Sequence, residues 1–113
     1  MSKKLSPQER MRGLLGLSQR AGRLITGTDS VLTAIKSGKA CLVLADQGAA
    51  ENTLKKVKDA CIYYHAPVMY LSEGLLESAT GRDGRMLGAL TDPGFAQKIQ
   101  EIMAEEGFLP DNA

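Results

Sequence analysis

Gly27 and the three residues after it have the types and spacing of a junction that binds anions or base edges. Gly27 and Thr28 follow a short β-rich run and precede an amphipathic helix, so free backbone N–H groups are expected at the helix N-terminus. The helix dipole favours an anion there. Nothing between Arg23 and Ala45 has the pattern of a nucleophile or a metal site. The junction predicts a surface for phosphate or base edges, with a simple strand-to-helix turn and its N-cap as the alternative.

Cys61 and His65 are the second pair of residues whose spacing could support chemistry. They are four apart, as in a metal site or a thiolate–imidazole pair, but with Cys41 they give zinc too few ligands and no C-x-x-C accompanies them. We therefore expect a core thiol and a surface histidine, with no metal, no cofactor and no catalytic group. A nucleotide-binding enzyme is disfavoured because no G-x-G-x-x-G or Walker sequence follows a strand.

Alternating helices and strands are expected to position these residues. With their caps, the helices are expected from Pro7 to Gly22, Thr28 to Ser37, Asn52 to Tyr64, Ser72 to Gly81 and Pro93 to Gly107, and the strands over 24–26, 41–45, 68–71 and 85–90. In the third helix the inward stripe is expected to be Leu54, Val57, Cys61 and Tyr64. This order predicts an α/β fold, a three-layer α/β/α sandwich around about four short mixed strands.

Length and composition are those of one globular domain over residues 1–113. We expect its ordered core over about residues 6–107 and a frayed tail from Leu109 to Ala113. No run approaches the roughly 18 apolar residues of a membrane span, and the basic N-terminus has no apolar segment behind it. Two cysteines in apolar surroundings fit buried thiols in a reducing cytoplasm.

The charges are unevenly distributed along the chain. Residues 1–40 contain eight lysines and arginines against two acidic residues, whereas residues 83–113 contain two basic residues against six acidic ones. This asymmetry predicts one basic face for a polyanion and an acidic C-terminal helix elsewhere. The alternative is that the basic residues simply cover a solvated face.

Two motifs in order resemble the ribosomal protein family of the L-seven-Ae / L-thirty-e type, which binds kink-turn RNA. The family motif Gly-x-Asn-Glu-x-x-Lys aligns with the segment 27–33, where Gly27 matches. The motif Val-x-Ser-Lys-x-x-Leu-Gly-x-Ala-x-Gly aligns with the segment 70–81, where the matching residues are Ser72, Leu76, Ala79 and Gly81. The bacterial YlxQ members are similar at residues 13–21, at 42–44 followed by Asn52 and Thr53, and at 91–96.

The resemblance implies a non-catalytic, cytoplasmic RNA-binding protein that acts on ribosomal or other structured RNA, with no cofactor, membrane contact or evident DNA specificity. The family contacts kinked RNA at the start of the second helix and in the loop before the fourth helix. The matching positions in this chain are Gly27, Thr28, Asp29, Ser30, Thr33 and Lys36, together with Tyr70, Leu71, Ser72 and Glu73.

Several of these positions depart from the family pattern. Asp29 replaces an asparagine and can only accept hydrogen bonds, and Ser30 replaces a longer glutamate. Thr33 replaces a lysine and so removes a phosphate contact, whose charge Lys36 could partly restore one turn later. Glu73 puts a negative charge where the family has a basic residue. These departures favour a different RNA or a weaker ribosome-linked contact, and they leave a protein–protein adaptor on the ribosome or the transcription and translation machinery as the alternative function.

Overall fold

The computed structural model describes residues 5–105, so the expectations for Gly107 and for the tail 109–113 lie outside the described residues. Helices and strands alternate as the sequence predicts. The helices are α1 (Pro7–Arg20), α2 (Thr28–Lys36), α3 (Glu51–Tyr64), α4 (Leu75–Thr80) and α5 (Pro93–Glu105), and the strands are β1 (Leu24–Thr26), β2 (Leu42–Asp46), β3 (Val68–Leu71) and β4 (Leu87–Leu90).

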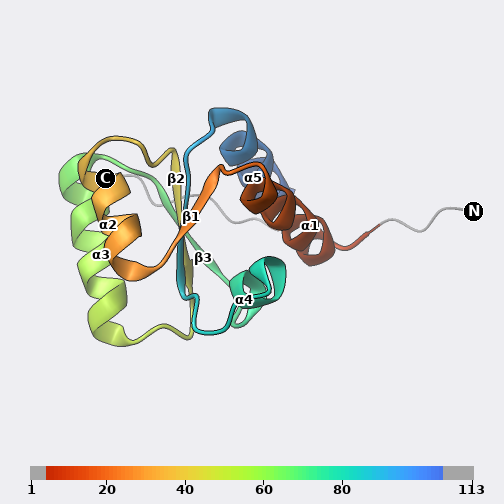
Figure 1. Ribbon diagram of the computed structural model, residues 1–113, viewed down its shortest axis with the longest axis horizontal. Helices are drawn as coiled ribbons and strands as arrows, with labels where there is room; N and C mark the ends of the chain where they lie inside the picture. The colour runs from red at the N-terminus through yellow and green to blue at the C-terminus, as the bar shows by residue number, and fades with distance from the viewer. Residues whose placement is uncertain (1–4, 106–113) are drawn as a thin grey trace, which may run out of the picture.

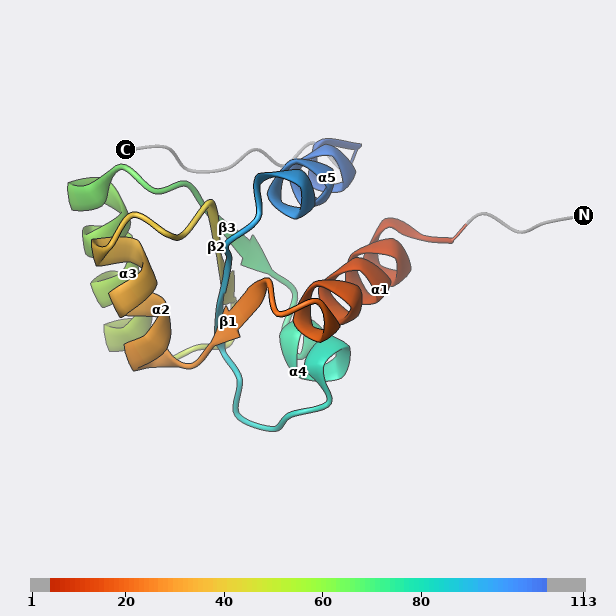
Figure 2. The same cartoon turned by 45° about the horizontal axis from the view of Figure 1, so that its top comes forward.

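The strands form one mixed sheet in the order β1-β4-β2-β3. Strand β4 is antiparallel to both β1 and β2, and β2 is parallel to β3. Helices α2 and α3 cover one face of the sheet, and α1, α4 and α5 cover the other (Figures 1 and 2). The predicted three-layer α/β/α sandwich with a mixed sheet is confirmed.

Strand direction gives the sheet two chemically different ends. Because β1, β2 and β3 all run opposite to β4, they finish at the same end, where α2 and α3 begin. We call this the junction end; it contains Gly27 and the segments 46–50, 72–74 and 82–86. The basic end is the opposite one, and it contains Arg23 and the segments 37–41 and 91–93. In Figure 1 the junction end lies at the bottom and the basic end at the top.

The core consists of two apolar clusters, one on each face of the sheet. Leu42 and Leu44 of β2 pack with α1, α4 and α5, whereas Val43 and Ala45 pack with α2 and α3. This alternation along a fully buried strand follows from the pleat, which points successive side chains to opposite faces. Between residues 5 and 105, no helix is long and apolar enough to cross a bilayer.

Several predicted element starts are wrong by a few residues. Helix α3 begins at Glu51 with Ala50 as its N-cap, so the cap lies before the expected position at Asn52. Helix α4 begins only after Gly74, which has a φ of 82°, so Ser72 is not its cap. The Ser72 carbonyl instead accepts a hydrogen bond from the Leu75 N–H and closes a turn before the helix.

The structure corrects two further expectations, the start of strand β4 and the inward stripe of helix α3. Strand β4 begins at Leu87 and not at Arg85, because its register with β2 starts at the pair formed by Leu87 and Ala45. Tyr64 is not part of the inward stripe of α3 and is 42% exposed. It lies in the last turn, and the following His65 has a φ of 58° that reverses the chain.

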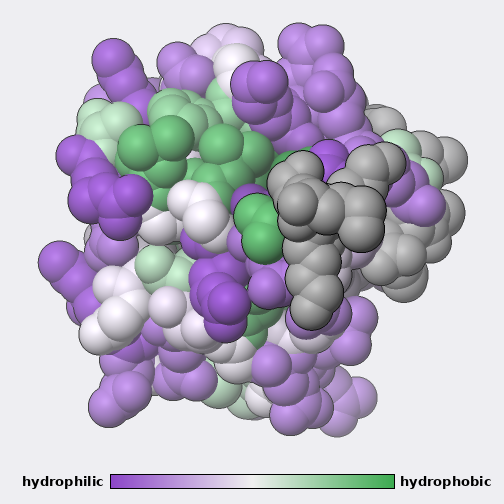
Figure 3. All heavy atoms as spheres, turned by 90° about the vertical axis from the view of Figure 1, so that its right-hand side faces the viewer, coloured by the Kyte–Doolittle hydropathy of each residue, from purple (hydrophilic) through white to green (hydrophobic). Residues whose placement is uncertain are grey.

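Close approach of α1 to α4 depends on one glycine of α1. A Cβ atom on Gly16 would lie 3.2 Å from the carbonyl oxygen of Ala79, so a larger residue would push the two helices apart. Gly13 has open space around it. The outer face of the layer formed by α1, α4 and α5 is mostly hydrophilic in Figure 3, with its largest apolar area bordered by polar side chains.

Candidate nucleic-acid interface

Gly27 makes the turn from β1 into α2 with a backbone conformation that only glycine adopts readily. Its φ is 103° and its ψ is 144°. The Gly27 N–H donates to the Leu87 carbonyl of β4 at 3.2 Å, and its carbonyl accepts from the Val31 N–H at 2.9 Å. The turn is therefore fixed to the sheet on one side and to the helix on the other.

The N-terminus of α2 presents backbone donors to solvent. The hydrogen bond from Val31 is the first of the helix, so the N–H groups of Thr28, Asp29 and Ser30 precede the intrahelical ladder. All three residues are exposed, and within the described part of the chain no side chain caps this helix. Gly27 is the N-cap residue, so the junction has the form of a strand-to-helix turn, and its cap has no side chain. The arrangement can donate to an oxygen of a ligand.

Arg85 lies beside this junction, and sequence reasoning missed it. A Cβ atom on Gly27 would sit 3.3 Å from the Arg85 Nη1 atom. The Arg85 Nε atom is buried and has no hydrogen-bond partner among the described residues. A guanidinium beside exposed helix amides adds a positive charge where the dipole already favours an anion. The sequence signal was an arginine between the Asp83-Gly84 turn and an apolar strand.

Asp46 is the other missed residue, and it joins two loops of the junction end. Asp46 is 1% exposed at the end of β2. Its Oδ1 accepts from the Gly48 N–H at 2.6 Å, and its Oδ2 accepts from the Gly74 N–H at 2.9 Å. Asp46 therefore holds the loop after β2 against the loop before α4. A single acid directly after an apolar strand, two residues before a glycine, was the available signal.

Glu73 packs against the loop after β2. A Cβ atom on Gly48 would lie 3.0 Å from the Glu73 Cγ atom, so the glycine leaves room for the stem of this side chain. Glu73 itself is exposed. The negative charge predicted from the sequence at this position therefore does lie at the surface of the junction end.

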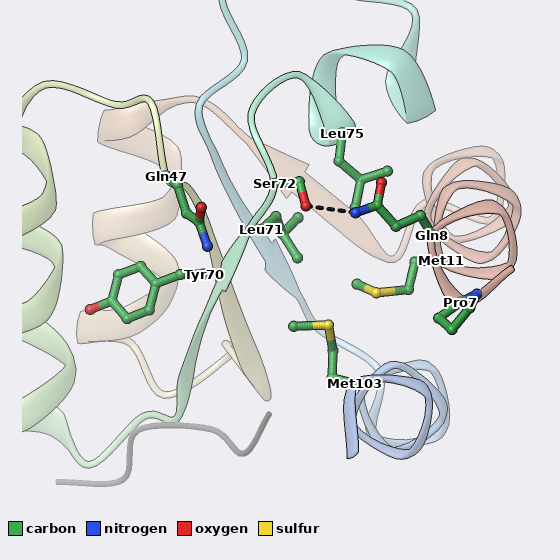
Figure 4. Close-up of a pocket in the computed structure, with 9 residues that line it drawn as sticks. All are labelled: Pro7, Gln8, Met11, Gln47, Tyr70, Leu71, Ser72, Leu75 and Met103. Atoms are coloured by element: carbon green, nitrogen blue, oxygen red, sulfur yellow. Dashed lines mark hydrogen bonds between the residues drawn. The ribbon is translucent and has the colours of Figure 1, made fainter. Parts of the chain in front are cut away.

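Tyr70, Leu71 and Ser72 do not present their side chains to one common surface. Tyr70 is half-buried and packs with the α2 and α3 side, whereas Leu71 is 1% exposed and packs with the other layer (Figure 4). The Leu71 side chain is thus buried in the core, and only the backbone of this candidate residue could contact a ligand. The Ser72 Oγ atom accepts a hydrogen bond from Gln8 Nε2 of α1 at 2.8 Å, beside a small cavity of about 60 Å³.

The two predicted contact segments lie at the same end of the sheet but at opposite edges. Strands β1 and β3 are the edge strands, so their ends are three interstrand spacings, or about 14 Å, apart. The segments 46–50 and 82–86 occupy the space between them. Thr33 and Lys36 lie on the exposed side of α2, with Lys36 about 12 Å along the helix axis from Thr28. The candidate contact residues are thus spread over the junction end and the exposed side of α2, and they do not form one compact site.

Exposed charge at the junction end is mostly negative. Asp29 and Glu51 lie in the first turns of α2 and α3, where the helix dipoles favour them, and Glu73 is exposed as well. In the segment 82–86 one exposed arginine and one exposed aspartate offset each other, and Arg85 adds a half-buried cation. Strong long-range attraction of a polyanion is therefore not a property of this end.

The thiols and the histidine occupy the positions expected for structural residues. Cys61 is buried, and burial raises the pKa of its thiol to about 11. Cys41 is half-buried and both thiols are free. His65 is exposed at the end of α3. The described residues contain no group of three or more histidine, cysteine, aspartate or glutamate side chains that could hold a metal ion.

Comparison with known proteins shows which family the chain belongs to. No family model matches it. Its sequence is 40% identical over 91 residues to the RNA-binding protein YlxQ of Bacillus subtilis, covering 80% of this chain and 91% of that protein. The chain belongs to the YlxQ family. The YlxQ protein of Enterococcus faecium, also named an RNA-binding protein, is 38% identical over 97 residues, covering 85% of this chain and 93% of its own.

Two solved structures share the fold of this chain. A protein of unknown function from Bacillus halodurans superimposes with a TM-score of 0.79 at 32% identity, covering 84% of this chain and 97% of its own. A 15.5 kD RNA-binding protein of Giardia lamblia superimposes with a TM-score of 0.71 at 14% identity, over 93% of this chain and 92% of its own. The second match shows that the fold is shared. The resemblance noted in the sequence is thus confirmed at the level of family and fold.

Proposed function

We propose that this YlxQ family member is a non-catalytic RNA-binding protein of the cytoplasm, associated with the ribosome, that recognises structured, kink-turn-like RNA at the junction end. Two relatives in the family are named RNA-binding proteins. The observation that carries the proposal is the N-terminus of α2, which has no side-chain cap among the described residues, is entered through Gly27 and is flanked by Arg85.

RNA oxygens would be bound mainly by the backbone. Gly27 has no side chain, so an RNA strand can approach the amides of residues 28–30 closely, and the Arg85 guanidinium adds charge-assisted donors. Asp29 would accept from a donor such as a guanine N1/N2 edge. Irregular RNA suits this geometry, because its splayed bases and backbone are accessible while the A-form major groove is not.

The loop before α4 would contribute through its shape more than through its side chains. The Leu71 side chain is buried and the Ser72 hydroxyl is bonded to Gln8. What the loop offers is the backbone of residues 72–74, held in place because Asp46 accepts from the Gly74 N–H. Contacts at this loop should therefore depend on Asp46 as much as on the residues of the loop itself.

A protein–protein adaptor is the second candidate, and the exposed acids favour it. Asp29, Glu51 and Glu73 would repel phosphate and would suit a basic protein surface. The two candidates differ in their response to RNase. Binding to purified ribosomes that survives RNase treatment and competition by free RNA would support the adaptor, and binding that is lost would support the RNA contact.

A binding titration tests the proposal directly. We expect salt-sensitive binding of the protein to a fluorescein-labelled kink-turn hairpin, to total ribosomal RNA, or to both, measured by fluorescence anisotropy and gel shift. Arg85→Gln should weaken binding about tenfold, in the range of one lost charged contact. Lys55→Gln is the matched control, because Lys55 lies on α3 and pairs with Asp59 at 3.5 Å. No binding to either RNA would refute the proposal.

A further inference from the structure

A shallow cavity at the basic end has a positive charge that no described residue of its wall neutralises. Its volume is about 510 Å³, and its two charged lining residues are Arg23 and Lys39. The remaining lining residues are uncharged: Gly22, Ile25, Gly38, Cys41, Thr91 and Pro93. The cavity is therefore a basic, partly apolar hollow.

Both cations are available to a ligand. Within residues 5–105, neither the Arg23 nor the Lys39 side chain forms a hydrogen bond or an ion pair. Arg10, beside another hollow, shows the contrast, because its guanidinium contacts Glu105 through both nitrogens at 2.8 and 2.7 Å. Asp92 lies near the basic hollow in sequence, but its carboxylate accepts from the Phe95 N–H at 3.0 Å and caps α5.

The backbone that carries these two side chains is tied to the sheet and to α2. The Arg23 carbonyl accepts from the Thr91 N–H at 3.0 Å, and the Lys39 N–H donates to the Ala34 carbonyl at 3.0 Å. The Cys41 N–H donates to the Leu90 carbonyl at 2.7 Å and fixes the segment between Lys39 and β2. The cations thus project from a fixed frame and not from a free loop.

The cavity lies along the same sheet edge as the junction. Arg23, Ile25 and Gly27 alternate along β1 and its flanking residues, so they share one face of this edge strand. Four residues at ~3.3 Å each separate Arg23 from Gly27 by about 13 Å. On one strand of duplex DNA this distance spans about four phosphate charges at ~3.4 Å each. A single RNA strand can therefore reach both places.

We propose that the Arg23 and Lys39 cavity binds the phosphate backbone of the RNA whose kinked part lies at the junction end. This inference rests on the proposed function and adds a second contact area to it. The junction end supplies amides but carries exposed acids, so the cations that attract the polyanion lie at the basic end. Phosphate contacts of this kind raise affinity without reading sequence.

The experiment compares the double variant Arg23→Gln, Lys39→Gln with Arg12→Gln, Lys98→Gln. The control pair is also one arginine and one lysine, both exposed on the α1 and α5 layer and without a hydrogen bond or ion pair in the described chain. Each protein is titrated with the kink-turn hairpin and with total ribosomal RNA at several salt concentrations, and thermal melting confirms that each is folded. The substitutions leave the backbone carbonyl of Arg23 and the N–H of Lys39 in place.

We expect the cavity variant to bind about tenfold more weakly at low salt and to lose about 1.5 from the slope of log affinity against log salt. The control pair should keep the wild-type slope within about 0.5. Equal slopes in the two double variants would overturn the cavity contact while leaving RNA binding at the junction in place. Absence of wild-type binding would overturn both proposals, and weaker binding by Arg85→Gln alone would support only the junction.

Discussion

The junction end and the basic end of the sheet differ in what they offer to an RNA. The junction end has a precise backbone, with exposed α2 amides behind Gly27 and two loops fixed by Asp46, yet its exposed side chains are mostly acidic. The basic end has two available cations around a shallow cavity. The fixed backbone geometry thus lies at the junction end, and the positive charge lies one strand length away at the basic end. Contacts at the junction end can therefore select the RNA while contacts at the basic end raise the affinity.

Removing the Asp46 carboxylate should have the largest effect and should damage only the junction end. Asp46→Ala removes the buried carboxylate that accepts from the Gly48 and Gly74 N–H groups through two part-buried hydrogen bonds. We expect a loss of about 3 kcal/mol in the free energy of unfolding, because hydrogen bonds to a charged group contribute about 1.5–3 kcal/mol each. Urea unfolding measures the loss.

Asp46→Asn is the matched variant because it keeps the shape and one acceptor oxygen. Its expected loss is about 1.5 kcal/mol, with part of the RNA affinity retained. Equal stability of Asp46→Ala and the wild-type protein would show that the carboxylate does not hold the two loops. The contact of Arg23 and Lys39 with RNA should survive either change, as a residual salt-dependent affinity.

Gly27→Ala should break the turn into α2. The φ of 103° is strained for any residue with a Cβ atom, and that atom would also lie 3.3 Å from Arg85 Nη1. We expect a loss of about 2 kcal/mol in unfolding free energy, within the range for such backbone strain. RNA affinity should fall as well, because the close approach to the α2 amides is lost.

Gly13→Ala is the control for this change. Gly13 lies inside α1, and a Cβ atom added to it would meet nothing within 4 Å, so alanine should stabilise the helix by about 1 kcal/mol. RNA affinity should stay at the wild-type value. If both alanine variants gained stability, the strained turn at Gly27 would be refuted.

The two cysteines distinguish the basic end from the core beside it. Cys41 lines the basic cavity and is half-buried, whereas Cys61 is buried with its pKa raised to about 11. At pH 8 we expect Ellman's reagent to modify Cys41 first, and bound ribosomal RNA to slow that reaction about fivefold by covering the cavity. An unchanged rate at saturating RNA would place the RNA elsewhere.

The raised pKa of Cys61 also sets a direction for the pH dependence of stability. Above pH 9 the unfolded chain releases the thiol proton while the folded protein keeps it up to about pH 11. The stabilisation is therefore complete below pH 9 and falls as the pH rises from 9 to 11, by at most about 1.4 kcal/mol per pH unit. Cys61→Ala should remove this part of the slope in urea unfolding experiments.

Local patterns were enough to predict the elements but not the way in which loops meet. Ser6 and Glu9 form the capping box that starts α1, with Pro7 at the first helical position, and hydrogen bonding to the Ser6 backbone lowers the pKa of Glu9. Gly27 ends β1 and starts α2, as its sequence context indicated. Both signals depend on residues within about four positions of each other, which is why the sequence alone contains them.

The site residues missed from the sequence are those that act across the fold. Asp46 bonds to Gly74, which is 28 residues away, and Arg85 reaches Gly27 from the segment before β4. Ser72 has the local pattern of a helix cap, but Gln8 of α1 holds its hydroxyl from 64 residues away. Leu71, the residue before Ser72, lies in the core because the pleat of β3 points its side chain inward. Such pairings follow from sheet order, which short-range spacing does not contain.

Asp29→Asn is the smallest change and tests whether the acidity of the junction end limits its affinity. Asparagine removes one negative charge and adds a donor at the exposed first turn of α2, so we expect about threefold tighter binding to the kink-turn hairpin. Stability should fall by about 0.5 kcal/mol, because a carboxylate near a helix N-terminus interacts favourably with the dipole.

Glu51→Gln is the matched control for Asp29→Asn, since it removes a similar charge at the start of α3. If Asp29→Asn and Glu51→Gln increased affinity equally, the gain would come from general charge and not from contact with Asp29. If neither changed affinity while Arg23→Gln, Lys39→Gln weakened it, the basic end alone would hold the RNA, and the separation of geometry from attraction would be wrong.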